Sequence, residues 1–378
     1  MQKGVLVPVL LALALVIAGC QSGGKGKVSS SSTPFIGGSE GLRVSFVENA
    51  PPTEVLDNPK PTDTTNSQVQ KFDVILKLDN VGEQDIAANG ARVTIGGIFP
   101  ADFGVPSLTA RTPKTLKNVL FAKKLEGVKK EIDGTKRSSI PEEMQFNDLG
   151  YVKQLEGNSE FPIQADICYK YTTKAVGDFC MRADLTRTQG GVCQAKGTKP
   201  VFSSGGPVQV TSVDESVGGR GKVILKFTVK AGGSGSFFKP DELDAQGKLP
   251  TDAPTCTRGD FSKENFVKVT VDSGITSASP NTGLACSGSK RGDPLKGTQV
   301  LEVRLNNGEG SITCIQDNVN VDALQKVNLQ VEYNHLVSAS TKVLVKHLPG
   351  FEGAPAPTAT PAATTAASSA PPPPPPPP

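Results

Sequence analysis

The sequence is poor in aromatic and imidazole side chains. Its 378 residues include no tryptophan, four tyrosines and two histidines. Carbohydrate-binding clefts usually offer aromatic faces, so this composition argues against a sugar ligand. The two imidazoles, His335 and His347, are too few for a histidine-based metal centre or proton relay, and we expect both to be structural.

Neither sign of charge is in excess, because 40 Lys and Arg residues face 37 Asp and Glu residues. A nucleic-acid binder usually carries a basic domain or stripe, so we expect no nucleic-acid partner. Beyond the first twenty residues, no apolar run approaches the ~20 residues that a membrane-spanning helix needs. The informative features are instead 40 glycines, 30 prolines and an odd number of cysteines, seven.

The amino terminus has the form of a secretory signal. Lys3 is followed by an apolar stretch from Val5 to Ile17, which is too short for a spanning helix. The stretch ends in Ile17-Ala18-Gly19-Cys20, which resembles the lipobox of prokaryotic lipoproteins. The resemblance implies a lipoprotein signal peptide and a lipid on Cys20, with export and anchoring to the cell membrane or outer envelope, outside the cytoplasm. The alternative is a plain signal peptide with a coincidental cysteine.

Six cysteines remain once Cys20 is assigned, and an even number in an exported protein predicts disulfides. They are Cys168, Cys180, Cys193, Cys256, Cys286 and Cys314. No pair has C-x-x-C spacing, so we expect no zinc ribbon and no metal site. Among fifteen possible pairings we favour Cys168–Cys180 within one hairpin and Cys286–Cys314. Cys193 and Cys256 then either pair across the two halves of the chain or stay free.

The region between residues 40 and 350 consists of short alternating runs broken by Gly, Pro, Asn and Asp. A period of two places one face of each strand in a core and the other in water. The clearest runs are Leu42–Val47, Phe72–Leu78, Ala91–Ile95, Val208–Val213, Val223–Val229, Phe266–Val271, Val300–Leu305 and Val327–Tyr333. Leu116–Ile132 suits either a helix or a strand with a polar excursion. The predicted fold class is all-β.

Three matches in the same order indicate an internal duplication. The segments from Leu42, Phe72 and Ile163 correspond to those from Pro207, Lys222 and Leu329, and the second pair shares the letters VILK. Each unit is expected to be a β-sandwich whose last two strands form a hairpin. The predicted parts are a signal peptide (1–19), a flexible Gly/Ser linker (20–40), two tandem immunoglobulin-like β-sandwich domains (41–205 and 206–350) and an Ala/Pro/Thr-rich tail ending in polyproline (351–378).

Two segments carry a family resemblance. Leu76–Ile86 is similar to a strand of bacterial and archaeal immunoglobulin-like surface modules, including the CARDB type. Cys168–Ala175, with Phe179-Cys180 behind it, resembles secreted β-sandwich proteins of DPANN-type archaea. The resemblance implies a fold and an extracytoplasmic address, and it implies no activity.

Catalytic and ligand-binding patterns are weak. The acidic groups Asp241–Asp244 and Glu142-Glu143 lack the regular spacing of a calcium loop. The Lys-rich segment 123–137 and the two Arg-Gly-Asp tripeptides, at 258–260 and 291–293, suit charged surface loops. We therefore expect no enzyme, no catalytic residue and no cofactor. The expected function is a structural or adhesive one, with membrane lipid at Cys20 and an envelope or surface protein as partners; the alternative is a solute-binding or envelope-assembly accessory lipoprotein.

Overall fold

A computed structural model describes most of the region between residues 33 and 349. The described residues are 33–61, 68–105, 116–183, 191–240, 253–276, 283–293, 297–317, 319 and 321–349. The signal peptide, Cys20, most of the linker, Asp241–Asp244 and the Pro-rich tail lie outside them. Among the described residues the fold is all-β, as predicted, and the single helical turn is the 3-10 helix η1 (Pro100–Phe103).

The described residues form twenty strands. In chain order they are β1 (Leu42–Phe46), β2 (Glu54–Leu56), β3 (Phe72–Asn80), β4 (Ala91–Gly96), β5 (Val119–Leu120), β6 (Lys129–Lys130), β7 (Lys136–Arg137), β8 (Glu142–Leu149), β9 (Ser159–Met181), β10 (Gly197–Lys199), β11 (Val201–Ser203), β12 (Val208–Gly219), β13 (Lys222–Ala231), β14 (Ser236–Phe238), β15 (Phe266–Asp272), β16 (Leu284–Cys286), β17 (Ser289–Asp293), β18 (Thr298–Arg304), β19 (Glu309–Gln316) and β20 (Ala323–Lys346).

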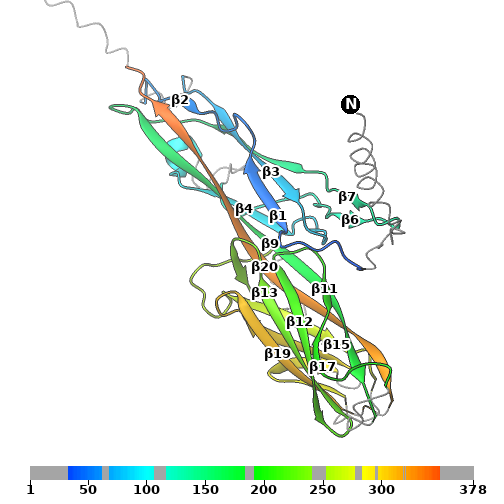
Figure 1. Cartoon of the computed structure of the whole chain (residues 1–378). Helices are drawn as coiled ribbons and strands as arrows, with labels where there is room; N and C mark the ends of the chain where they lie inside the picture. The colour runs from blue at the N-terminus through cyan, green and yellow to red at the C-terminus, as the bar shows by residue number, and fades with distance from the viewer. Residues whose placement is uncertain are drawn as a thin grey trace, which may run out of the picture.

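Two very long strands form the axis of an elongated molecule (Figure 1). All 23 residues of β9 pair antiparallel with β20, from Ser159 opposite Val345 to Met181 opposite Ala323. The predicted closing hairpins are therefore wrong, because β9 and β20 each continue as one strand where a turn was expected. Between Gln164 and Val176 the chain contains no Pro, Gly or Asn that would favour a turn.

Two sandwiches share the sheet that contains β9 and β20. Above the middle of the axis in Figure 1, the sheet β1-β3-β8 accompanies β4 and β5; we call this part lobe one (strands β1 to β8 with the adjoining halves of β9 and β20). Below it, the sheet β10-β12-β13-β19-β16 accompanies β15, β17 and β18; we call this part lobe two (β10 to β19 with the other halves). The shared ten-stranded sheet runs through both lobes.

The order of strands is similar in the two lobes. In lobe one β3 lies between β1 and β8, and in lobe two β13 lies between β12 and β19. On the shared sheet, β4 pairs with β9 as β15 pairs with β20. Each long strand begins in its own lobe and ends in the other, so the shared sheet joins residues on both sides of the boundary predicted at 205/206.

The Leu116–Ile132 segment contains no helix. It holds β5, β6 and irregular chain, which is the strand-with-excursion alternative. Its apolar residues Leu116, Phe121 and Leu125 are buried in the lobe-one core, and Leu125 exchanges both backbone hydrogen bonds with Ile86. Tertiary packing thus overrides the weak helical preference of its Lys and Glu residues.

All six body cysteines form disulfides, but only one pair is the expected one. Cys286 pairs with Cys314, as predicted, whereas Cys168 pairs with Cys256 and Cys180 with Cys193. The predicted Cys168–Cys180 bridge is wrong because both residues lie on β9, where a rise over twelve positions along the strand places them about 40 Å apart. A disulfide requires Cα atoms within about 7 Å.

Candidate functional site

The N-terminal segment docks in the middle of the molecule, where the two lobes meet around Gly205-Gly206; we call this region the waist. Glu83, in the turn after β3, accepts backbone hydrogen bonds from Ile36 (3.0 Å) and Gly37 (2.9 Å), and also from Gly205 in the chain that enters lobe two. Gly206 N donates to Gly38 O at 3.0 Å. One carboxylate thus holds the incoming chain against both lobes, and the described chain begins at the waist rather than at either end.

Three of the four tyrosines are buried at the waist. Tyr169 and Tyr171 lie on β9, and Tyr333 lies opposite Tyr171 on β20. The Tyr171 hydroxyl donates to Gly205 O (2.8 Å) and accepts from Gln84 N (3.1 Å). Each hydroxyl therefore ties the long ladder to another segment, and burial raises the pKa values of all three tyrosines far above their ordinary value, so that the hydroxyls keep their protons.

Glycine is required where these hydroxyls approach the backbone. A Cβ atom on Gly82 would lie 1.9 Å from the Tyr171 hydroxyl oxygen, and one on Gly206 would lie 2.7 Å from the Thr173 hydroxyl. Tyrosine is thus rare in the sequence, but three of its four copies share one structural role at the waist.

His335 belongs to the same network. Its Nε2 lies 2.9 Å from Ser234 O, which can only accept, so Nε2 carries the proton and Nδ1 accepts from the Tyr169 hydroxyl at 2.8 Å. The Tyr169 oxygen in turn accepts from Leu42 N at 3.0 Å. The ring of Phe237 stacks on the imidazole, with centroids 4.6 Å apart. Burial lowers the pKa of His335 to about 4, although the hydrogen bond to Ser234 opposes the shift.

His347 follows β20 directly, at the end of lobe one that is far from the waist. Its Nδ1 lies 2.8 Å from a carboxylate oxygen of Asp57, whose side chain is fully buried. Asp57 also accepts the backbone N–H groups of Leu155 and Leu348, each at 2.8 Å. Burial alone would raise the pKa of Asp57, but these hydrogen bonds and His347 lower it. His335 therefore joins β20 to β9 and to the chain before β14, and His347 joins the end of β20 to the chain after β2.

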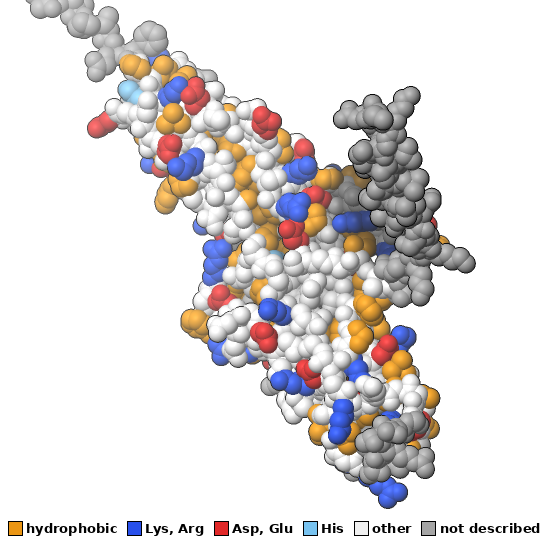
Figure 2. Space-filling model, in the orientation of Figure 1, with side chains coloured by type: hydrophobic (Ala, Val, Ile, Leu, Met, Phe, Trp, Pro, Cys, Tyr) orange, Lys and Arg blue, Asp and Glu red, His pale blue; other side chains and the backbone are white. Residues whose placement is uncertain are grey.

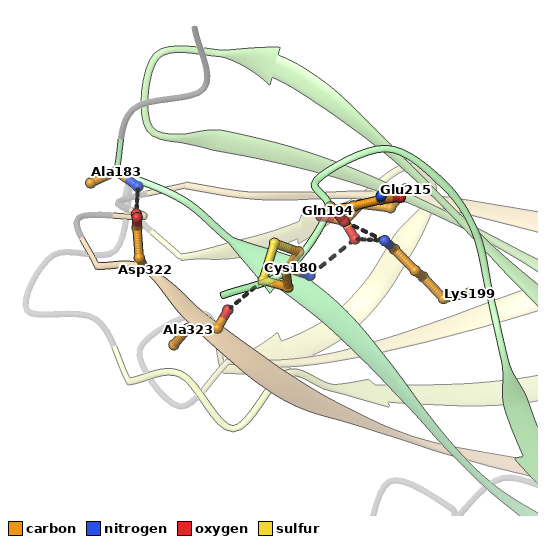
Figure 3. Close-up of a disulfide and its surroundings, with 8 residues drawn as sticks. Cys180, Ala183, Gln194, Lys199, Glu215, Asp322 and Ala323 are labelled. Carbon is orange, nitrogen blue, oxygen red and sulfur yellow. Dashed lines mark hydrogen bonds and ion pairs between the residues drawn. A yellow bond between two sulfur atoms is a disulfide. The ribbon is translucent and has the colours of Figure 1, made fainter. Parts of the chain in front are cut away.

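The distal end of lobe two is built around the Cys180–Cys193 disulfide (Figure 3). Glu215 on β12 accepts the backbone N–H of Cys180 at 3.0 Å, and its carboxylate lies 3.4 Å from Lys199 Nζ. Burial raises the pKa of Glu215 above its ordinary value, although Cys180 and Lys199 oppose the shift. Ala183 N donates to Asp322 at 2.8 Å, and the Cys193 sulfur lies 3.4 Å from Ala323 O. These contacts tie the irregular chain after β9 to the start of β20.

The Lys-rich segment 123–137 forms ion pairs with carboxylates elsewhere in lobe one. Asp85 lies 2.6 Å from Lys129 Nζ and 2.9 Å from Lys124 Nζ. Burial would raise the pKa of Asp85, but the two ammonium groups and Gly127 N lower it to about 2. Acidic and basic side chains are mixed over the visible face of the molecule (Figure 2). The first Arg-Gly-Asp is a turn in which Asp260 accepts from Ser262, and the second falls in β17.

A cleft of about 650 Å³ opens in lobe two between β18 and β19. These consecutive strands are joined by a tight turn at Asn307-Gly308 and then enter different sheets. β16 pairs with only Cys314–Gln316 of β19, and Glu309 is bridged to Asn306, so within the described residues the edge of β19 between them, Gly310–Ile312, has no second ladder partner. Glu302, Arg304 and Glu309 line the cleft over a floor of Leu301 and Ile312.

No group of three or more His, Cys, Asp or Glu side chains in the part of the chain that the structure describes is arranged to hold a metal ion. No helix within the described ranges is long and apolar enough to cross a membrane.

Comparison with known proteins adds little to this picture. No family model and no curated protein matches the sequence. Among solved structures, the secreted serine protease VesC from Vibrio cholerae is similar over 70% of this chain, with 10% identity and a TM-score of 0.15. The match covers 47% of that chain, so this chain spans about half the length of the protease structure. A likeness at this level has no bearing on fold or activity.

Proposed function

We propose that this is an exported lipoprotein, anchored at Cys20, whose two-lobed β body has a structural or adhesive role on the cell surface or envelope. The observation that carries the proposal is the set of three disulfides in the body. Disulfides persist in oxidising, extracytoplasmic surroundings, which is where a signal sequence ending in a lipobox would deliver the chain. The resemblance to CARDB-type and archaeal surface modules points the same way.

The docked N-terminal segment sets the distance between this body and a membrane. The residues between Cys20 and Thr33 reach at most about 45 Å when fully extended. Because Ile36 and Gly37 are held by Glu83, the waist is the part of the body nearest the anchor along the chain. Both lobes would then be held within reach of partners in the envelope.

A non-enzymatic role is supported by the state of the imidazoles. His335 is buried with both ring nitrogens hydrogen-bonded, and His347 is bound to Asp57. An accessory role in envelope assembly is the second candidate, and the β18–β19 cleft favours it. Its incompletely paired β19 edge is the kind of surface to which an extended polypeptide adds as a further strand.

The anchor is tested by replacing Cys20 with Ser in the natural host. We expect the variant protein to be found in the soluble fraction and not in the membrane fraction, because the Cys20 sulfur is the atom that would receive the lipid. Ser22→Ala, two residues away, serves as the matched control and should remain bound. If Cys20→Ser stays in the membrane fraction after washing with high salt, the lipid assignment is wrong.

A further inference from the structure

A second cleft, of about 270 Å³, lies on the outer face of the shared sheet beside the Cys168–Cys256 disulfide. Its floor comes from three neighbouring strands, since Arg92 on β4 and Leu336 on β20 both lie opposite Cys168 on β9. The loop containing Cys256 forms its wall. That loop is fixed by the disulfide and by a 3.1 Å hydrogen bond from Asn334 Nδ2 to Thr255 O.

Arg92 has no ion-pair partner in this cleft. Its Nε is inaccessible to solvent and makes no hydrogen bond, and no acidic side chain among the described residues forms an ion pair with it. A guanidinium is always charged and carries five donors, so a buried N–H without an acceptor is costly. The Arg92 side chain that lines the cleft therefore brings a positive charge that no described carboxylate neutralises.

A second guanidinium faces the same space. Arg258 Nη2 lies 3.5 Å from Asp166 Oδ1 and 3.3 Å from Ser338 Oγ, which are long contacts, and its side chain is 56% exposed. Asp166 is already shared, because it also accepts from Gln164 Nε2 at 2.8 Å and from Ser338. Arg258 thus has further N–H donors for a ligand, whereas the Asp166 oxygen Oδ1 already accepts from Gln164, Ser338 and Arg258.

The charge and polarity of the cleft lining indicate which kind of ligand would bind there. Among the described residues, two guanidiniums and one carboxylate are the only charged groups that line the cleft, so it carries one uncompensated positive charge. Threonine side chains at positions 94, 255 and 257 add hydroxyls at the rim. The disulfide and Leu336, which pack with Phe238, form a dry backing.

We propose that this cleft binds a carboxylate monoanion, held between Arg92 and Arg258. A planar carboxylate matches the fork of a guanidinium and accepts two parallel N–H bonds from it. One negative charge neutralises the lining, whereas a dianionic phosphate or sulfate would overshoot it. The dry backing favours an organic acid whose apolar part lies against Leu336. This inference is independent of the lipid anchor at Cys20.

The test follows the arginine Nε–H signals of the full-length protein by NMR, with 15N-labelled arginine. Sodium acetate is added at constant ionic strength, with chloride replaced, and sodium sulfate is titrated separately. We expect saturable shifts of the Arg92 and Arg258 signals with acetate, while the Arg43 signal, from an exposed side chain paired with Glu40, stays in place. Arg258→Gln should weaken acetate binding about tenfold, since one charge-assisted pair is lost.

Variants separate a site from general charge effects. Arg92→Gln should abolish the saturable shift of Arg258, and Arg43→Gln, which removes the same charge elsewhere, should leave it unchanged. If Arg92→Gln does not fold, Arg258→Gln decides the question, because that side chain is largely exposed. The proposal is overturned if the Arg92 signal does not saturate with acetate, if all arginines shift alike, or if sulfate binds more tightly than acetate.

Discussion

Lobe one and lobe two repeat one strand order but are stabilised by different means. Lobe one contains no disulfide of its own among the described residues; its interior holds an aromatic cluster in which Phe103 contacts Phe72, Tyr151 and Phe161 with centroids 5.3–6.3 Å apart. Lobe two carries Cys180–Cys193 and Cys286–Cys314, and its Phe237 on β14 contacts Tyr333 and His335 at the waist. The third disulfide, Cys168–Cys256, lies beside the waist.

The difference shows which features of two lobes with one strand order are interchangeable. The pairings of β3 and β13 with their neighbours are retained in both lobes, since they determine which faces are buried. The brace within each lobe differs. Packed rings stabilise the folded lobe by burial and ring contacts, whereas a disulfide acts mainly by restricting the unfolded chain. Each brace should therefore be removable without loss of the other lobe.

Removing the aromatic brace should have the largest effect. Phe103 is fully buried, and Phe103→Ala should cost about 3–5 kcal/mol in the free energy of unfolding. Hydrogen exchange should show faster exchange in β3 and β8 but not in β13 and β19. Phe99→Ala is the control, because Phe99 is 72% exposed and should change stability little. Equal acceleration in both lobes would show that they do not unfold separately.

Removing the Cys286–Cys314 bridge should destabilise lobe two and leave lobe one unaffected. The two cysteines are separated by 28 residues, and the double substitution Cys286→Ser/Cys314→Ser should cost about 3–4 kcal/mol. Chemical denaturation monitored by hydrogen exchange should locate the loss in β16 and β19. Ser287→Ala, in the adjacent turn, provides the control. A loss that appears first in β3 would contradict the assignment of this brace to lobe two.

Acidification should act on the waist and thus on both lobes together. The pKa of His335 is about 4 in the folded chain and near 6.5 when unfolded, so its contribution is present above pH 6.5 and is lost as the pH falls through 4. This proton uptake should cost about 3 kcal/mol at most. His335→Gln should flatten that part of the pH profile of unfolding. If the variant and the parent lose stability in parallel between pH 6.5 and 4, His335 is not the group responsible.

The sequence predicted the strands well where alternation was clear. Phe72–Leu78 and Phe266–Val271 differ from β3 and β15 by two residues or fewer at each end, because alternate apolar side chains fill the core. It failed for β9 and β20, whose halves belong to different lobes. A chain segment carries no mark of the sheet that will receive its second half, although the absence of Pro, Gly and Asn between Gln164 and Val176 is a usable signal for β9.

The candidate sites were harder to predict for a related reason. Arg92 looks like an ordinary outward-facing strand residue until β9, β20 and the Cys256 loop surround it, and Cys168 and Cys256 are 88 residues apart. Glu83 likewise has no distinguishing neighbours in the sequence. Such sites arise from register between distant strands, which composition and spacing do not encode.

The position of the docked N-terminal segment determines how the body would carry mechanical load. Chain leaves the described structure at Thr33, by the waist, and again at Pro349, at the far end of lobe one. Tension between these points would pass through the Glu83 contacts and along the lobe-one half of β20. The force on the β9–β20 ladder would then run parallel to the strands, so that its hydrogen bonds are loaded together and not one after another. Lobe two lies off this path, so it would keep its shape, and its β18–β19 cleft, while the rest of the molecule is under strain.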